Sequence, residues 1–191
     1  MRLLNLFLFI SVFHLFTLFL LNFIEISGQH LSEPTTGFNL YHNQIHSFEL
    51  MYPSNWTYVE FADKLIDTDL NVVVSFISPL DSSVDPFQEF FTIKTIKLDS
   101  NDSFSNNFNQ YLEKLKKYIA NINISKLDDI SDQSKYLKYS FSPQPGLIIN
   151  KTEYILLNND NYVFHLEFTS NNNNKTFEML INKIVSNFRI V

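Results

Sequence analysis

The sequence predicts an α+β fold in which helices cover an antiparallel β-sheet of six to seven strands, preceded by an N-terminal hydrophobic helix. Two observations carry this prediction. Apolar residues repeat every three to four positions in two segments, and they repeat at every second position in several others. Because a helix buries one stripe and a half-buried strand buries alternate side chains, the two periods separate helices from strands.

Two amphipathic helices are predicted. The first extends from Phe108 to Ile122, and the second extends from Phe177 to Phe188, with Asn174 as a possible N-cap. We expect both helices to pack on one sheet in one main core. That core is predicted to include Phe48, Leu50, Trp56, Leu112, Leu115, Phe164, Phe168, Leu180 and Ile184.

Strands are predicted where apolar residues alternate, at residues 48–52, 72–76, 137–141 and 162–168. Residues 90–98 also alternate, but their phase slips near Thr95, which predicts a β-bulge. The polar segment 158–161 separates residues 153–157 from 162–169. Its asparagines tolerate positive φ, so an antiparallel hairpin is expected there.

The chain is divided into three parts by its hydrophobicity. Residues 1–28 are predicted to be a signal peptide or a signal anchor, 29–37 a linker, and 38–191 one domain. No charge interrupts the run from Leu3 to Ile24, which as a helix would span about 33 Å. Gly28 is a small residue suited to cleavage, so removal and retention both stay open. Arg2 before the run places the domain on the extracytoplasmic side, either secreted or membrane-anchored.

Composition excludes several functions. The 191 residues include no cysteine, which rules out disulfides, thiolate metal sites and cysteine nucleophiles. Lysine and arginine number 14 against 20 aspartates and glutamates, which argues against binding to nucleic acid. The sequence has neither a G-x-S-x-G elbow nor a glycine-rich phosphate loop, so we do not expect an enzyme.

Several segments together resemble one known domain family. They are Tyr41-His42-Asn43, Phe48-Glu49-Leu50-Met51-Tyr52-Pro53-Ser54-Asn55-Trp56, and Val74-Ser75-Phe76-Ile77-Ser78-Pro79-Leu80. In this order they resemble the opening strands of the PsbP-like domain family, and the resemblance extends over residues 38–191. It implies a sheet sandwiched by helices, as in Mog1-like proteins, and a lumenal or extracytoplasmic accessory protein. Photosynthetic members bind photosystem II, but nothing in this sequence indicates photosynthesis.

Candidate metal ligands are few. His165 and Glu167 are two residues apart on one strand, so both side chains could reach one zinc or calcium ion. The other face of that strand carries Phe164, Leu166 and Phe168, and we therefore favour a solvent-exposed face for His165 and Glu167. Oxygen ligands in the loop 81–85 could hold calcium.

Asn-x-Ser/Thr sequences provide candidate glycosylation sites. They occur at Asn55, Asn101, Asn123, Asn150 and Asn174. Asn101 and Asn174 are the better exposed candidates.

These observations lead to one functional expectation and one alternative. We expect a non-enzymatic extracytoplasmic accessory domain that docks on a membrane-associated protein assembly, and that contacts the membrane through the N-terminal helix if this is not cleaved. The alternative is a small-molecule or metal-ion binding protein, with calcium or zinc as the ion. Its ligand would occupy a cleft between the sheet and the helix that begins near Phe108.

Overall fold

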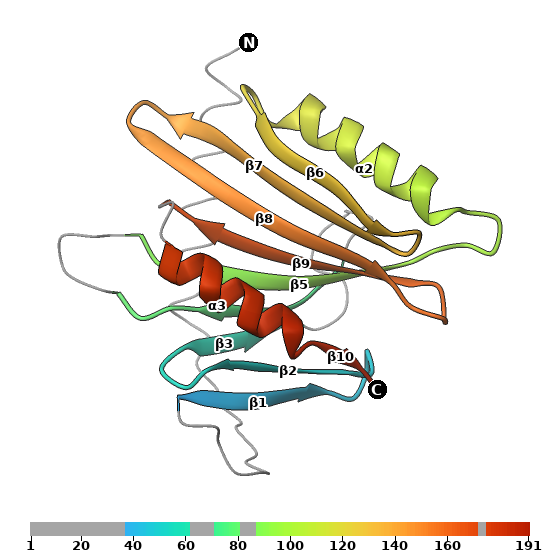
Figure 1. Cartoon of the computed structure of the whole chain (residues 1–191), viewed down its shortest axis with the longest axis horizontal. Coiled ribbons are helices and arrows are strands. Elements are labelled where there is room, and N and C mark those ends of the chain that lie inside the picture. The colour runs from blue at the N-terminus through green and yellow to red at the C-terminus, as the bar shows by residue number, and fades with distance from the viewer. Residues whose placement is uncertain (1–36, 62–70, 81–86, 172–174) are drawn as a thin grey trace. The chain divides into compact units, whose positions relative to one another are not determined.

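The computed structural model describes residues 37–61, 71–80, 87–171 and 175–191 (Figure 1). The predicted N-terminal hydrophobic helix, Asn174 and the loop 81–85 lie outside these residues. Within the described ranges, no helix has both the length and the apolar character that a membrane span requires.

The described residues form ten strands and two helices. The strands are β1 (Phe38–Asn43), β2 (Phe48–Pro53), β3 (Thr57–Glu60), β4 (Asn71–Ile77), β5 (Phe90–Lys97), β6 (Asn123–Ser131), β7 (Ser134–Gln144), β8 (Leu147–Leu157), β9 (Tyr162–Ser170) and β10 (Arg189–Ile190). The helices are α2 (Phe104–Tyr118) and α3 (Lys175–Ser186). The α+β class and the antiparallel pairing are confirmed, because every strand pair is antiparallel.

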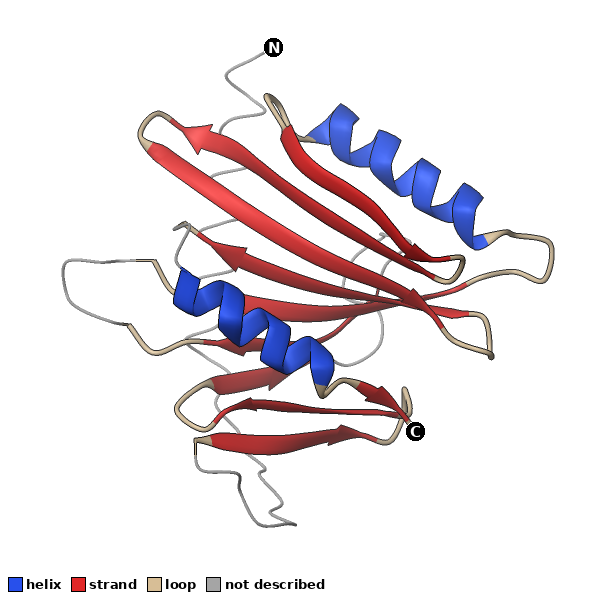
Figure 2. Ribbon diagram, in the orientation of Figure 1, coloured by secondary structure: helices blue, strands red, loops and turns tan. Residues whose placement is uncertain are grey.

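The described strands form two sheets rather than the single sheet expected. Seven strands form the larger sheet in the order β3-β4-β5-β9-β8-β7-β6, and β1-β2-β10 form a smaller one. Helix α3 and the small sheet pack on one face of the large sheet, and α2 packs on the other. Figure 2 shows α3 across the middle strands and α2 alongside β6. The single-sheet prediction was wrong because periodicity shows that a strand is half-buried and not which sheet it joins.

The large sheet separates two cores, which corrects the prediction of one main core. One core joins the large sheet to the small sheet and α3, and it contains Phe48, Trp56 and Phe164. The other joins the large sheet to α2 and contains Leu112. Among the predicted core residues, Leu115 and Leu180 are only partly buried.

The phase slip in β5 has a different cause from the predicted bulge. Strand β5 pairs with β9 without interruption from Phe90 to Lys97, and the irregularity lies in the neighbouring strand, between Val72 and Val74. Phe91 and Ile93 belong to the core of the small sheet and α3, whereas Leu98 belongs to the core under α2. Both faces of the segment are covered, so apolar residues occur in both phases.

The two helices and the predicted hairpin are confirmed, but both helices begin and end earlier in the chain than predicted: α2 is Phe104–Tyr118 and not 108–122, and α3 is Lys175–Ser186 and not 177–188. Helix α2 begins at Phe104, and Ser103 is its N-cap. The Ser103 hydroxyl accepts a hydrogen bond from the backbone N–H of Asn106 at 3.2 Å. It ends at Tyr118, because the backbone of Ile119 is extended, with φ of -100° and ψ of 105°. The chain then turns into β6 with Asn121 at a positive φ of 58°. Strands β8 and β9 form the expected antiparallel hairpin.

Candidate functional site

A network of buried polar side chains lies on the face of the large sheet that α2 partly covers. In the strand register, Lys94 of β5 lies opposite His165 of β9. Glu153 of β8 lies opposite Glu167 of β9. Because directly opposed residues project to the same face, four titratable side chains from three adjacent strands come together.

His165 and Glu167 are buried, so the expectation of a solvent-exposed face was wrong. Their residues are 2% and 5% exposed. Strand β9 lies at the centre of seven strands and is covered on both faces, with Tyr111 of α2 packed edge-on against the His165 ring at 4.7 Å between centroids. The polar phase of β9 therefore faces the protein interior and not water.

Glu153 connects α2 to the sheet. Its side chain is completely buried, and the Tyr111 hydroxyl donates to Oε1 at 2.7 Å and to Oε2 at 2.6 Å. The Tyr139 hydroxyl of β7 also donates to Oε1, at 2.9 Å. Burial, together with the Glu153 charge, raises the pKa of both tyrosines well above the ordinary value, so both stay protonated donors.

Glu167 is held between two lysines. The Lys94 ammonium donates to Oε2 at 2.9 Å, and the Lys151 ammonium donates to Oε1. Burial alone would raise the pKa of the Glu167 carboxyl, but Lys151 and Lys94 outweigh it and hold this pKa far below the ordinary range. For Lys94, burial lowers the pKa, while Glu167 and Glu153 raise it, and the net direction is upward.

Most polar groups of the network are already paired with one another. Two carboxylates face two ammonium groups, and each carboxylate already accepts hydrogen bonds from donors. His165 differs, because neither ring nitrogen has a hydrogen-bond partner among the described residues, and Nδ1 lies 3.7 Å from Glu153 Oε2. Across those residues, no group of three or more histidine, aspartate or glutamate side chains converges as a metal site requires.

Sequence reasoning identified two members of the network and missed Glu153, Lys94 and Lys151. One signal was present for Glu153, which shares its phase in β8 with the apolar residues Ile155 and Leu157. A carboxylate in the apolar phase of a strand indicates a buried partner. The partner, Tyr111, is 42 residues away and was invisible to local patterns.

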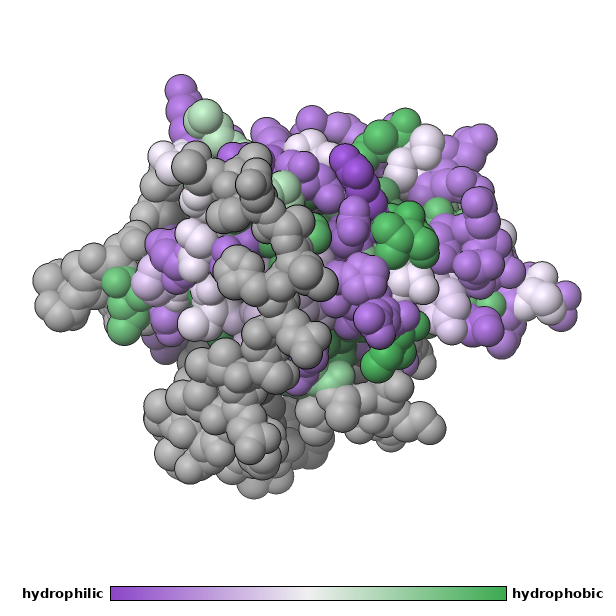
Figure 3. Space-filling model, turned by 90° about the horizontal axis from the view of Figure 1, so that it is seen from below, coloured by the Kyte–Doolittle hydropathy of each residue, from purple (hydrophilic) through white to green (hydrophobic). Residues whose placement is uncertain are grey.

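An exposed aliphatic cluster lies at one end of the small sheet. It consists of Ile45 in the β1–β2 turn, which is 80% exposed, together with the exposed Ile190 and Val191. The backbone N–H of Val191 donates to the carbonyl of Ser47 at 2.9 Å, and Ile190 lies opposite Phe48, which places the three residues at the same end of the small sheet. We call these three residues the Ile45 patch. Figure 3 views the domain from the β1 side and shows separate hydrophobic residues among hydrophilic ones.

The predicted glycosylation site at Asn101 lies in an exposed turn before α2. The hydroxyl of Ser103 in the same Asn-x-Ser sequence caps that helix. Asn101 therefore stays a prediction with an accessible side chain.

Comparison with known proteins gives similarity in structure alone. No family model matches the sequence, and no curated protein matches it. The solution structure of cyanobacterial PsbP (CyanoP) from Synechocystis sp. PCC 6803 is 13% identical, with a TM-score of 0.59 over 86% of this chain and 98% of that chain. The Saccharomyces cerevisiae Ran-binding protein Mog1p is 7% identical, with a TM-score of 0.53 over 81% of this chain and 95% of that chain. The chain therefore has the PsbP/Mog1-like fold that the sequence resemblance predicts.

Proposed function

We propose that this chain is a non-enzymatic binding domain, held on the extracytoplasmic side of a membrane, that docks on a membrane-associated protein assembly. The single observation that carries this proposal is the Ile45 patch. Exposed aliphatic side chains grouped at one site are typical of protein–protein contact surfaces, because water contact with them is unfavourable until a partner covers them.

Two further observations support a binding role over catalysis. The buried carboxylates of the network are occupied by tyrosine and lysine donors, so they are not available to activate a substrate. The similar Mog1p is described as a Ran-binding protein, which means that this fold serves protein recognition elsewhere. The uncharged run after Arg2 supports the extracytoplasmic location.

Site-specific photocross-linking in native membranes tests the proposal. A photoreactive amino acid replaces Ile45 in the full chain, and the control replaces Ile148, which is 58% exposed in the β7–β8 hairpin region. We expect a discrete adduct with a membrane-associated protein from position 45 and none from position 148. Absence of an adduct from position 45, or identical adducts from both positions, would contradict the proposal.

A second candidate function is metal-ion binding at His165 and Glu167, with zinc or calcium as the ion. One observation favours it, because both nitrogens of the buried His165 ring lack hydrogen-bond partners in the described part of the chain. Calorimetric titration with each ion tests it. Micromolar binding that is lost in the His165→Ala variant would support this candidate, and no heat of binding would remove it.

A further inference from the structure

Strand β6 forms an edge of the large sheet with an unusual degree of exposure. It stands last in the strand order and pairs, among the described residues, with β7 alone. Residues 125–133 are all exposed, so α2, which packs on the sheet face, does not cover this part of the edge. Such an edge offers backbone N–H and C=O groups to an additional strand.

Two irregularities limit what can pair there. The β6–β7 register shifts between Ile124 and Lys126 and again between Asp129 and Ser131. Bulges and charged residues protect an edge against unspecific pairing. Only the stretch 126–129 is regular, so a partner strand must match these four side chains closely.

We propose that β6 pairs with β6 of a second copy of this chain, antiparallel, with Leu127 opposite Leu127 of the second copy. The result is a two-fold symmetric dimer with one continuous sheet. This register places Lys126 opposite Asp128 of the second copy, and the symmetry repeats that pair. Each copy thus contributes one cation and one anion to two cross-strand ion pairs.

Symmetry leaves few alternative registers. A two-fold axis perpendicular to the sheet keeps each face continuous, so the pairing must be centred on a residue rather than between two residues. Centring on Lys126 would oppose two lysines, and centring on Asp128 or Asp129 would oppose two aspartates. Like charges directly opposite each other are unfavourable, and therefore the register centred on Leu127 is preferred.

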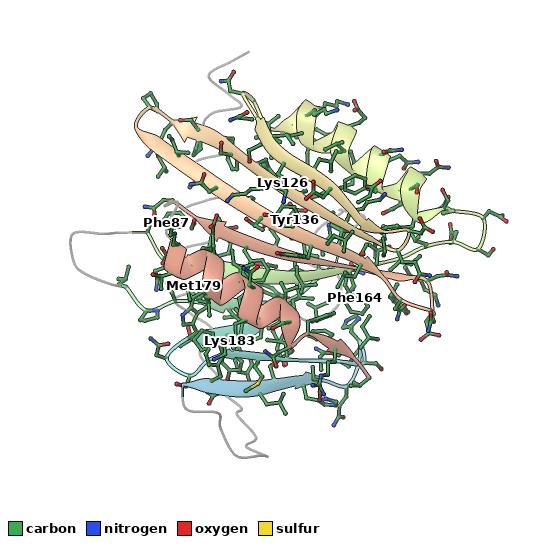
Figure 4. The ribbon with its side chains drawn as sticks, viewed as in Figure 1. Phe87, Lys126, Tyr136, Phe164, Met179 and Lys183 are labelled. Atoms are coloured by element: carbon green, nitrogen blue, oxygen red, sulfur yellow. The ribbon has the colours of Figure 1, made fainter. Side chains whose placement is uncertain are left out.

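The two faces of the pairing are also chemically consistent. Leu127, which is 45% exposed, lies opposite the buried Leu137 and so shares its face with the core under α2. Pairing would cover Leu127 with its own copy and extend that apolar surface across the dimer axis. Lys126 and Asp128 project to the other face, where Lys126 lies over the Tyr136 ring at 5.2 Å (Figure 4).

Little is lost when these charges change partners. Lys126 contacts Asp128 of its own strand at 2.9 Å, but both side chains are exposed. Exposed ion pairs contribute little to stability in water. Exchange of the two intrachain pairs, one in each copy, for two pairs across the dimer axis therefore meets little resistance.

Disulfide cross-linking tests the register directly, since the chain has no cysteine of its own. In an antiparallel pair the opposed Cα atoms are about 4.5 to 5.5 Å apart, within the range that a disulfide spans. Mild oxidation of the full-length Leu127→Cys chain in native membranes should give a covalent homodimer. The Ile148→Cys control, at a similarly exposed site, should stay monomeric.

Charge reversal in the Leu127→Cys chain tests the ion pairs. Lys126→Asp should lower the dimer yield several-fold, and addition of Asp128→Lys should restore it. Three results would overturn the proposal. They are failure of Leu127→Cys to form a homodimer, a disulfide from position 127 to another protein in place of the homodimer, and no restoration of the yield by the second reversal. If Leu127→Cys does not fold, a mixture of Lys126→Cys and Asp128→Cys chains serves instead, and the absence of a mixed dimer overturns the proposal equally.

Discussion

The hydroxyl of Tyr111 lies 2.7 Å from Oε1 and 2.6 Å from Oε2 of Glu153, in the centre of the sheet. This contact joins α2 to β8 across 42 residues of sequence. It also satisfies a carboxylate that is completely buried, so the position of α2 depends on a polar contact as well as on apolar packing.

Removal of the Tyr111 hydroxyl should therefore destabilise the domain. Tyr111→Phe leaves the ring in place but takes a donor from a buried carboxylate, which costs about 1 to 3 kcal/mol in free energy of unfolding. Urea unfolding measures the effect. Tyr118→Phe, at an exposed position at the end of the same helix, should change the free energy of unfolding little. Equal stabilities of the two variants would show that the Tyr111–Glu153 contact contributes nothing.

Substitution of Glu167 should lower the free energy of unfolding more than Tyr111→Phe does. Glu167→Gln leaves Lys94 and Lys151 without their carboxylate on a largely buried face, and breaking a buried ion pair in this way costs about 3 to 5 kcal/mol. Glu113→Gln is the matched control, since Glu113 pairs with Lys116 on the exposed surface of α2. A midpoint of chemical unfolding that moves equally in both variants would argue against the buried network.

The same carboxylate predicts the direction of acid destabilisation. The pKa of Glu167 is lower in the folded chain than its ordinary value of 4.5, because Lys151 and Lys94 outweigh the effect of burial. The unfolded chain therefore takes up a proton first as the pH falls. The stabilisation is fully present above about pH 4.5 and is lost as the pH falls toward the folded pKa.

Thermal melting between pH 6 and pH 3 measures this dependence. The melting temperature of the unmodified chain should fall more steeply below pH 4.5 than that of Glu167→Gln, which has no proton to gain at this position. Parallel curves for the two chains would contradict the assignment.

Two leucines of α2 differ in burial, so replacing each of them by alanine should lower the free energy of unfolding by different amounts. Leu112 is buried under the helix, so Leu112→Ala should lower the free energy of unfolding by about 2 to 5 kcal/mol. Leu115 is only partly buried, and Leu115→Ala should cost less. A larger loss for Leu115→Ala in chemical unfolding would mean that α2 is rotated relative to this description.

Local sequence patterns predicted what depends on local structure. The apolar stripe of α2 and the β8–β9 hairpin follow from residues close together in the chain, and both are confirmed. The burial of Glu167 could not be predicted in this way, because it depends on Lys94, 73 residues away. The alternation of polar and apolar residues in a strand predicts that the polar ones are exposed to solvent, unless a buried partner is known. For the same reason, Glu153 was missed, although its phase in β8 matched that of Ile155.

The assignment of strands to the small sheet could not be predicted from local patterns either. The hairpin of β1 and β2 was recognised by its resemblance to PsbP-like domains, but its separation from the large sheet was not. Strand β10 completes the small sheet after α3, through pairing of Ile190 with Phe48. This contact joins segments from opposite ends of the domain and creates the Ile45 patch that the proposed function uses.

The most direct test of the proposed function is the size of the native assembly that contains this chain. Gentle solubilisation of native membranes, followed by native electrophoresis, should place the unmodified chain in a large complex. Ile45→Asp should release it as a smaller species, whereas Ile148→Asp, a similarly exposed change elsewhere, should not. A chain that migrates at the same size in all three cases, whether free or assembled, would contradict docking through the Ile45 patch.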